Sequence, residues 1–162
     1  MSVDRYHQYF VISWDQLHRD VRSLCQQLVE RDFEGIAAVT RGGLIPAALI
    51  ARELNVRLID TVCIKSYEHM DQGGLQVLKG IDHDGARWLL VDDLVDTGRT
   101  ARAVRDMLPR AHFVTVYAKP EGRPLVDQYL VEVPQDTWIQ FPWDMGITYV
   151  EPLVDQLRSQ QE

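Results

Sequence analysis

Carboxylates, hydroxyl groups and glycine are concentrated in one short stretch of the chain, directly after the apolar run Leu89–Val91. The stretch reads, in order, Asp92, Asp93, Leu94, Val95, Asp96, Thr97, Gly98, Arg99 and Thr100. It leads into a predicted helix, and a turn at a helix N-terminus suits a phosphate because backbone N–H groups and the helix dipole face it. The carboxylates would repel a phosphate, so we expect them to bind ribose hydroxyls and Mg²⁺. The sequence therefore predicts a site for a sugar phosphate and a metal ion.

A second candidate loop, Thr40–Gly43, follows the apolar run Gly35–Val39. Its two glycines allow backbone N–H groups to approach an anion closely, and Arg41 adds a fork of guanidinium donors. We expect this loop to hold a second anionic group.

Strands and helices alternate along the chain and must position these loops. Apolar or alternating patterns predict strands over 9–13, 35–39, 57–66, 88–91 and 112–118. Helices are predicted after Ser13, which precedes Gln16 at capping-box spacing, over 46–54, and after Thr100. This order indicates an α/β fold with a parallel sheet and helices on both faces. Both loops then lie beyond the carboxyl ends of strands, where such sheets bind ligands.

The run from Asp92 to Thr100 resembles the phosphoribosyl-diphosphate (PRPP) motif of the type I phosphoribosyltransferases. The chain resembles the members of that family that act on 6-oxopurines over about residues 9–152. The matching stretches are Val39–Gly43, Val91–Thr100, Phe113–Pro120, Pro134–Ile139 and Pro142–Gly146. The resemblance implies one domain over 1–162, with a sheet core over about 9–129. It also implies a small purine-binding subdomain, here called the hood, over about 130–152, and the irregular sequence after Leu130 predicts that the hood leaves the sheet.

The resemblance implies a role for each residue of the two loops. Asp92 and Asp93 would bind the ribose hydroxyls, with Asp93 also on Mg²⁺. The remaining PRPP contacts would come, mostly through backbone donors, from Leu94, Val95, Asp96, Thr97, Gly98, Arg99 and Thr100. Arg41 and Gly42 would hold pyrophosphate, next to a cis peptide bond just before Arg41.

A purine site is implied by the same resemblance. Lys119 would donate to the 6-oxo group. An ammonium group can only donate hydrogen bonds, so it favours this carbonyl oxygen over the 6-amino group of adenine. Trp138 would stack on the base, and the Ile139 backbone would contact its 2-position edge. Asp96 would exchange a proton with purine N7, and it is also a candidate helix N-cap. We assign no role to Asp144.

The resemblance thus implies transfer of the 5-phosphoribosyl group from PRPP to guanine or xanthine, and less well to hypoxanthine. Two alternatives are a hypoxanthine–guanine enzyme with little xanthine activity and a non-catalytic PRPP-sensing regulator. The polar loop 68–75 would close over the substrates. This chain has Gly73 where relatives often carry Arg, so the pyrophosphate contact of that loop is not expected from residue 73, and Lys65 and Lys79 are the candidates to replace it. It also has Arg99 where many relatives carry Gly.

Composition limits the remaining possibilities. A formal net charge of −7 argues against a protein that coats nucleic acid. The chain lacks an apolar run of roughly 18 residues and a signal-peptide pattern in Met1–Tyr9, which predicts a cytoplasmic protein. Cys25 and Cys63 lack metal-ligand spacing and are expected to be buried thiols, with a single disulfide left open. The resemblance implies a homotetramer and allows peripheral contact with the inner membrane.

Overall fold

The computed structural model describes residues 8–66, 74–146 and 153. Within these ranges the elements are β1 (Gln8–Val11), α1 (Trp14–Gln26), β2 (Gly35–Thr40), α2 (Leu44–Glu53), β3 (Ile59–Ser66), β4 (Leu75–Lys79), β5 (Trp88–Val95), α3 (Arg99–Met107), β6 (His112–Ala118), η2 (Arg123–Leu125), β7 (Gln128–Glu132), β8 (Thr137–Gln140) and η3 (Pro142–Asp144). The predicted alternation of strands and helices is confirmed. Apart from β5, each predicted strand begins and ends close to its expected bounds.

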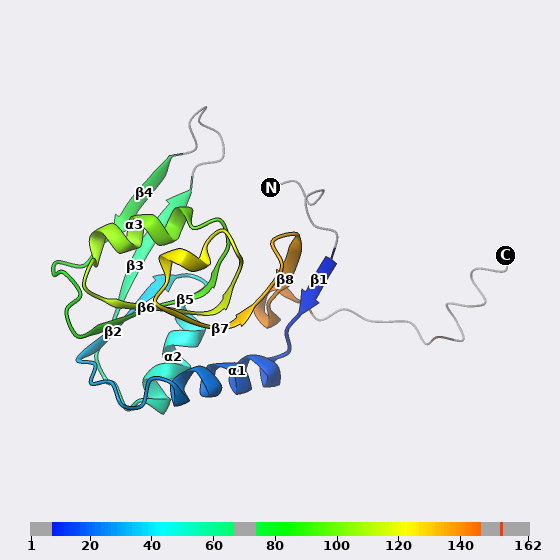
Figure 1. Ribbon diagram of the computed structural model, residues 1–162, viewed down its shortest axis with the longest axis horizontal. Helices are drawn as coiled ribbons and strands as arrows, with labels where there is room; N and C mark the ends of the chain where they lie inside the picture. Colours follow the sequence, from blue (N-terminus) through cyan, green and yellow to red (C-terminus); the bar gives the residue numbers. More distant parts are fainter. Residues whose placement is uncertain (1–7, 67–73, 147–152, 154–162) are drawn as a thin grey trace.

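Six strands form the central sheet in the order β4-β3-β2-β5-β6-β7 (Figure 1). All neighbouring pairs are parallel except β3 with β4, which confirms the mainly parallel α/β fold. The carboxyl ends of β2, β5 and β6 therefore lie side by side at one edge. The segments that follow these three strands carry the predicted site.

Helix α1 is fixed at its start and along its length. The Ser13 hydroxyl accepts the N–H of Gln16 at 3.1 Å, which confirms the N-cap, while the Gln16 side chain donates to Asp20 at 2.7 Å. The buried Asp20 also accepts from the Tyr117 hydroxyl of β6 at 2.6 Å, so α1 is tied to the sheet. Its inward face contains the predicted Leu17, Val21 and Leu24, while Leu28 is buried just after the helix ends.

The two faces of the sheet are covered by different helices. Apolar side chains of α1 and α2 pack into one core cluster with β2, β5 and β6, and those of α3 pack into a second cluster. Figure 1 shows α3 on the face of the sheet opposite α1 and α2. Burial of both faces explains why β2 and β6 read as continuous apolar runs.

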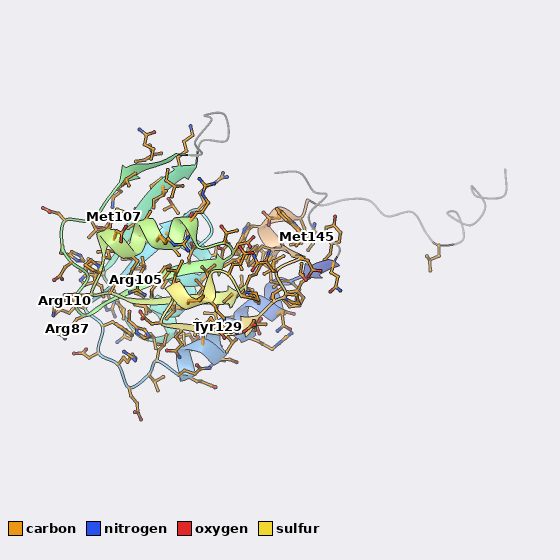
Figure 2. All side chains as sticks on the ribbon, turned by 45° about the horizontal axis from the view of Figure 1, so that its top comes forward. Arg87, Arg105, Met107, Arg110, Tyr129 and Met145 are labelled. Atoms are coloured by element: carbon orange, nitrogen blue, oxygen red, sulfur yellow. The ribbon has the colours of Figure 1, made fainter. Side chains whose placement is uncertain are left out.

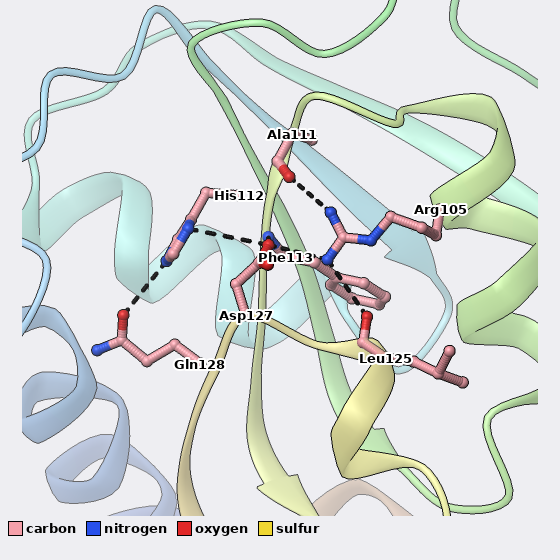
Figure 3. Close-up of polar contacts among 7 residues, drawn as sticks. All are labelled: Arg105, Ala111, His112, Phe113, Leu125, Asp127 and Gln128. Carbon is pink, nitrogen blue, oxygen red and sulfur yellow. Dashed lines mark hydrogen bonds and ion pairs between the residues drawn. The ribbon is translucent and has the colours of Figure 1, made fainter.

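A cluster of polar contacts anchors the end of α3 to the sheet (Figure 3). Arg105 donates to the carbonyl oxygens of Ala111 at 2.8 Å and Leu125 at 3.2 Å, and to the Asp127 carboxylate at 2.8 Å. Asp127 also accepts the N–H of Phe113 at 2.7 Å. Burial opposes ionisation of Asp127, but the Phe113 N–H and the Arg105 guanidinium hold its pKa below the usual range. These contacts fix the helix whose other end faces the predicted phosphate.

Two exposed arginines illustrate how positive charge is neutralised on this acidic chain. Figure 2 shows Arg87 and Arg110 at the end of the molecule opposite Met145. Arg87 pairs with Asp32 and with Glu34, and Arg110 pairs with Asp84 at 3.0 Å. Exposed pairs of this kind contribute little to stability, but they cancel local charge.

The sequence-based prediction is wrong at three boundaries. Strand β5 continues to Val95, because Asp92 and Leu94 keep pairing with β6. Strand β7 joins the sheet beside β6, so the chain does not leave the sheet at Leu130 but after Glu132. Helix α3 begins at Arg99, and its N-cap is Gly98 at φ 84°, not Asp96.

The hood is linked to the start of the chain by a second, two-stranded sheet. Strands β1 and β8 are parallel, with Tyr9 opposite Trp138 and Phe10 opposite Ile139. The edge strand predicted near Tyr9 is therefore present, but it belongs to this small sheet. Figure 1 shows the pair beyond β7, at one side of the molecule.

Cys25 is buried, Cys63 is half-buried, and both are free thiols. The open possibility of a disulfide between them is thereby excluded. Within 8–66, 74–146 and 153, no helix has the length and apolar character required to cross a bilayer.

Candidate active site at the carboxyl edge of the sheet

The loop between β2 and α2 lies against the carboxylates of β5. The peptide bond between Thr40 and Arg41 is cis, as the resemblance implied. A Cβ atom at Gly42 would lie 2.4 Å from Asp93 Oδ2, and one at Gly43 would lie 2.5 Å from the Val91 carbonyl oxygen. Only glycine fits this close approach, so the sequence brings the predicted anion-binding loop and the acids of β5 into contact. Arg41 is exposed at the edge of the loop.

Asp92 and Asp93 are half-buried at the end of β5. Asp92 Oδ1 accepts the N–H of Asp93 at 2.9 Å, and Asp93 Oδ1 accepts the N–H of Leu94 at 2.7 Å. Burial, with the charge of Asp93 added, raises the pKa of Asp92 well above its usual range. Burial also raises the pKa of Asp93 to about 6, with a further contribution from Asp144. A carboxylate pair that is this costly to ionise favours a cation or hydroxyl donors beside it.

The segment after β5 forms a turn whose geometry depends on glycine. Gly98 adopts φ 84°, and a Cβ atom there would meet Leu125 Cδ1 at 2.3 Å. Helix α3 starts at the next residue, and no side-chain hydrogen bond caps it. Thr97 is exposed and Thr100 half-buried. Because the left-handed conformation belongs to Gly98, Arg99 occupies an ordinary helical position.

Leu94 and Val95 have no polar side chain to offer at this edge. Leu94 packs against one core cluster, and the buried Val95 belongs to the other. The Val95 carbonyl oxygen accepts the N–H of Lys119 at 2.9 Å, so the register of β5 with β6 carries Lys119 to the turn after β5.

Lys119 and Asp96 form an ion pair inside this turn. Lys119 is 1% exposed, and its Nζ lies 3.0 Å from Asp96 Oδ2. A buried ammonium group requires such a partner, because its desolvation is costly. Gln135 contacts the other oxygen of the same carboxylate, with Nε2 2.7 Å from Oδ1. The predicted base-recognition residue and the predicted proton acceptor are thus in direct contact.

The hood residues are on β8. Trp138 is 37% exposed, and Ile139 is buried with its side chain in the core cluster of α1 and α2. Ile139 can therefore reach a ligand only through its backbone, as expected. Gln135, three residues before Trp138, provides the contact that joins this part of the chain to Asp96.

One of the two lysines proposed to replace the loop arginine is engaged elsewhere. Lys79 contacts Asp60 and donates to the Thr61 carbonyl oxygen at 2.7 Å, so it does not replace the arginine that relatives carry near Gly73. Lys65 is an exposed residue of β3 that also has polar or electrostatic contacts. Most of the loop 68–75, including Gly73, lies outside the described residues.

Sequence reasoning missed Gln135 and the influence of Asp144 on Asp93. Both residues lie within stretches that carry the family resemblance, but no local spacing places Gln135 beside Asp96 or Asp144 beside Asp93. Among the described residues, no group of three or more His, Cys, Asp and Glu side chains is arranged to hold a metal. A cation at this edge would therefore complete its shell with ligand or water oxygens.

The chain matches the phosphoribosyl transferase domain over residues 13–149. It belongs to the phosphoribosyltransferase family. The matched range contains both anion loops, the ion pair and the hood residues. The geometry above therefore describes the candidate ligand edge of a phosphoribosyltransferase domain.

Two curated relatives span nearly the same length as this phosphoribosyltransferase. A xanthine-guanine phosphoribosyltransferase of Chromohalobacter salexigens is 86% identical over 159 residues, which cover 98% of each chain. One from Desulfotalea psychrophila is 58% identical and covers 93% of this chain and 96% of its own.

Solved structures show the same fold at much lower identity. A purine phosphoribosyltransferase of Pyrococcus horikoshii superposes with a TM-score of 0.76 at 24% identity, over 90% of this chain and 99% of that one. The xanthine-guanine-hypoxanthine phosphoribosyltransferase of Helicobacter pylori gives a TM-score of 0.70 at 22% identity, over 96% of this chain and all of the other.

Proposed function

We propose that this chain catalyses a step of purine salvage. It transfers the 5-phosphoribosyl group of PRPP to guanine or xanthine, and less well to hypoxanthine. The products are the purine 5′-monophosphate and pyrophosphate. The observation that carries the proposal is the Lys119–Asp96 pair, which lies in the turn that leads to the uncapped start of α3. The relatives named as xanthine-guanine phosphoribosyltransferases support the choice of bases.

PRPP is proposed to lie along the carboxyl edge. Backbone N–H groups over 97–100, with the Thr97 and Thr100 hydroxyls, bind the 5′-phosphate, since the first N–H groups of a helix have no carbonyl partner within the helix and lie at the positive end of its dipole. Leu94 and Val95 contribute only backbone. Asp92 and Asp93 accept the ribose hydroxyls, and Arg41 with Gly42 binds pyrophosphate. The tight packing of Gly42 on Asp93 supports this order, because it brings the Arg41 loop against the acids that precede the turn over 96–100.

The acids of β5 fit Mg²⁺. Asp93 is the proposed protein ligand, since burial raises the pKa of both carboxyl groups and a bound cation would favour their ionised forms. When bound, Mg²⁺ neutralises negative charge on the departing pyrophosphate. Loss of activity in a chelator, with recovery on adding Mg²⁺, tests this part of the proposal.

The purine is proposed to lie between Trp138 and the Lys119–Asp96 pair. Lys119 donates to the 6-oxo group, Trp138 stacks on the ring, and the Ile139 backbone contacts the 2-position edge. As N9 forms its bond to the anomeric carbon, the bond from that carbon to pyrophosphate breaks, and Asp96 takes the N7 proton. Donors from the Arg41 loop stabilise the charge that develops on the leaving group.

Two other functions are distinguished by one assay. The wild-type protein is mixed with PRPP, Mg²⁺ and each of guanine, xanthine and hypoxanthine, and pyrophosphate release is followed. Release with guanine and xanthine supports the proposal, whereas release with hypoxanthine and guanine alone favours the hypoxanthine–guanine enzyme. Binding of PRPP without any release favours the sensing regulator and would overturn the enzyme assignment.

Assembly and location complete the proposal. We expect a homotetramer, and the exposed apolar side chains of Ile59, Val77 and Leu78 on neighbouring strands β3 and β4 suit a subunit contact. Sedimentation equilibrium tests the mass. The proposed location is the cytoplasm, with peripheral membrane contact as a further prediction that co-flotation with anionic vesicles tests.

A further inference from the structure

Gln135 makes the contact that joins the hood to the proposed proton acceptor. Its Nε2 donates to Asp96 Oδ1 at 2.7 Å, while Lys119 Nζ donates to Oδ2 at 3.0 Å. Each oxygen of the carboxylate therefore has its own donor, one neutral and one charged. Gln135 lies in the turn between β7 and β8, far from Asp96 in the sequence.

A second hydrogen bond fixes which way the Gln135 amide points. The N–H of Glu121 donates to Gln135 Oε1 at 3.0 Å, so the amide nitrogen must face Asp96. Glu121 belongs to the turn after Lys119. A Cβ atom at Gly122 in that turn would lie 2.6 Å from the Asp96 carbonyl oxygen. The turn, Asp96 and Gln135 thus form one closely packed unit.

We propose that Gln135 is a positioning residue that holds the Asp96 carboxylate in place when the purine binds; this rests on the function proposed above. An ammonium group has three N–H donors, so Lys119 can donate to the 6-oxo group while it stays close to Asp96 Oδ2. Oδ2 has a further lone pair for the N7 proton, and Gln135 remains on Oδ1. Asp96 then keeps its orientation at the moment it accepts the proton.

Two substitutions distinguish a role of Gln135 in positioning Asp96 from a role in holding only the turn at Glu121. Gln135→Glu keeps an acceptor for the Glu121 N–H but replaces the donor to Asp96 with a like charge. Gln135→Met keeps the length of the side chain and removes both hydrogen bonds. If Gln135 acts on Asp96, the Glu variant is impaired at least as strongly as the Met variant. If it only tethers the turn at Glu121, the Glu variant behaves like the wild type.

The expected result is a fall in kcat of roughly 10- to 100-fold in both variants, as for a misplaced catalytic group. The KM for PRPP should stay within about two-fold, because Gln135 contacts the Asp96 side chain and the expected PRPP contacts of this segment are mostly through the backbone. Gln27→Met is the matched control, since Gln27 contacts Gln128 and not the site. Thermal unfolding and PRPP binding check that each variant folds. A Glu variant with wild-type kcat overturns the inference, whereas a wild-type protein without pyrophosphate release overturns the proposed function instead.

Discussion

Replacing Asp93 with asparagine should stabilise the ligand-free protein while it removes activity. Burial raises the pKa of this carboxyl group from 3.8 to about 6, so the folded state resists its ionisation. Asparagine removes the charge and keeps an oxygen for the Leu94 N–H, which Asp93 accepts at 2.7 Å. The same change deletes the proposed Mg²⁺ ligand. A residue that costs stability where it serves ligand binding is typical of functional sites.

The size of the effect follows from proton linkage. Raising the pKa of Asp93 from 3.8 to about 6 lowers the free energy of unfolding at pH 7 by at most about 3 kcal/mol. Because Asp93 is only half-buried, water screens part of this, and we expect a gain of about 1–2 kcal/mol. The folded-state pKa is raised, so the penalty in the wild type is full above about pH 6 and disappears as the pH falls toward 4. The advantage of Asp93→Asn should shrink over the same range.

Urea unfolding in EDTA, at pH 7 and again near pH 4.5, measures the difference. Asp82→Asn is the matched control, because it removes an exposed carboxylate outside the site and should change stability by less than about 0.5 kcal/mol. Adding Mg²⁺ with PRPP should stabilise the wild type more than the variant. An Asp93→Asn protein that is less stable than the wild type at pH 7 in EDTA would refute the reasoning.

Four further predictions concern individual side chains. Asp96→Asn should keep PRPP affinity and lower turnover by roughly 10²-fold or more in a pyrophosphate-release assay, and unchanged turnover would refute the proton role. Lys119→Ala should weaken purine binding and spare PRPP binding in calorimetry. An equal loss of both affinities would show that Lys119 does not belong to the purine site. Gly42→Ala should raise the KM for PRPP at least about ten-fold, because the new methyl group overlaps the Asp93 carboxylate. Iodoacetamide at pH 8 should modify Cys63 before Cys25, since burial raises the pKa of Cys25 to about 11, and simultaneous labelling would contradict this.

The alternation of strands and helices could be predicted because each buried strand is a short apolar run between turn residues. The same rule misplaced the end of β5. Asp92 and Asp93 interrupt the apolar pattern, but the backbone goes on pairing with β6 to Val95. Strand β7 was missed because it is a half-buried edge strand, and its mixed sequence lacks a distinct periodicity.

The candidate site could be predicted where its residues are neighbours in the sequence, as in the turn before α3. Contacts between distant segments could not be predicted in this way. Nothing in the spacing of Gln135 places its amide on Asp96, because that contact depends on how the turn after β7 packs against the turn after β6. The raised pKa of Asp93 likewise depends on burial and on Asp144, which only the fold provides.

The parallel pairing of β1 with β8 has a consequence for protein synthesis. The central sheet can assemble once β7 has left the ribosome, but Gln8–Val11 must wait for Thr137–Gln140 to emerge before it finds its partner. The two-stranded sheet that carries Trp138 is therefore completed after the central sheet.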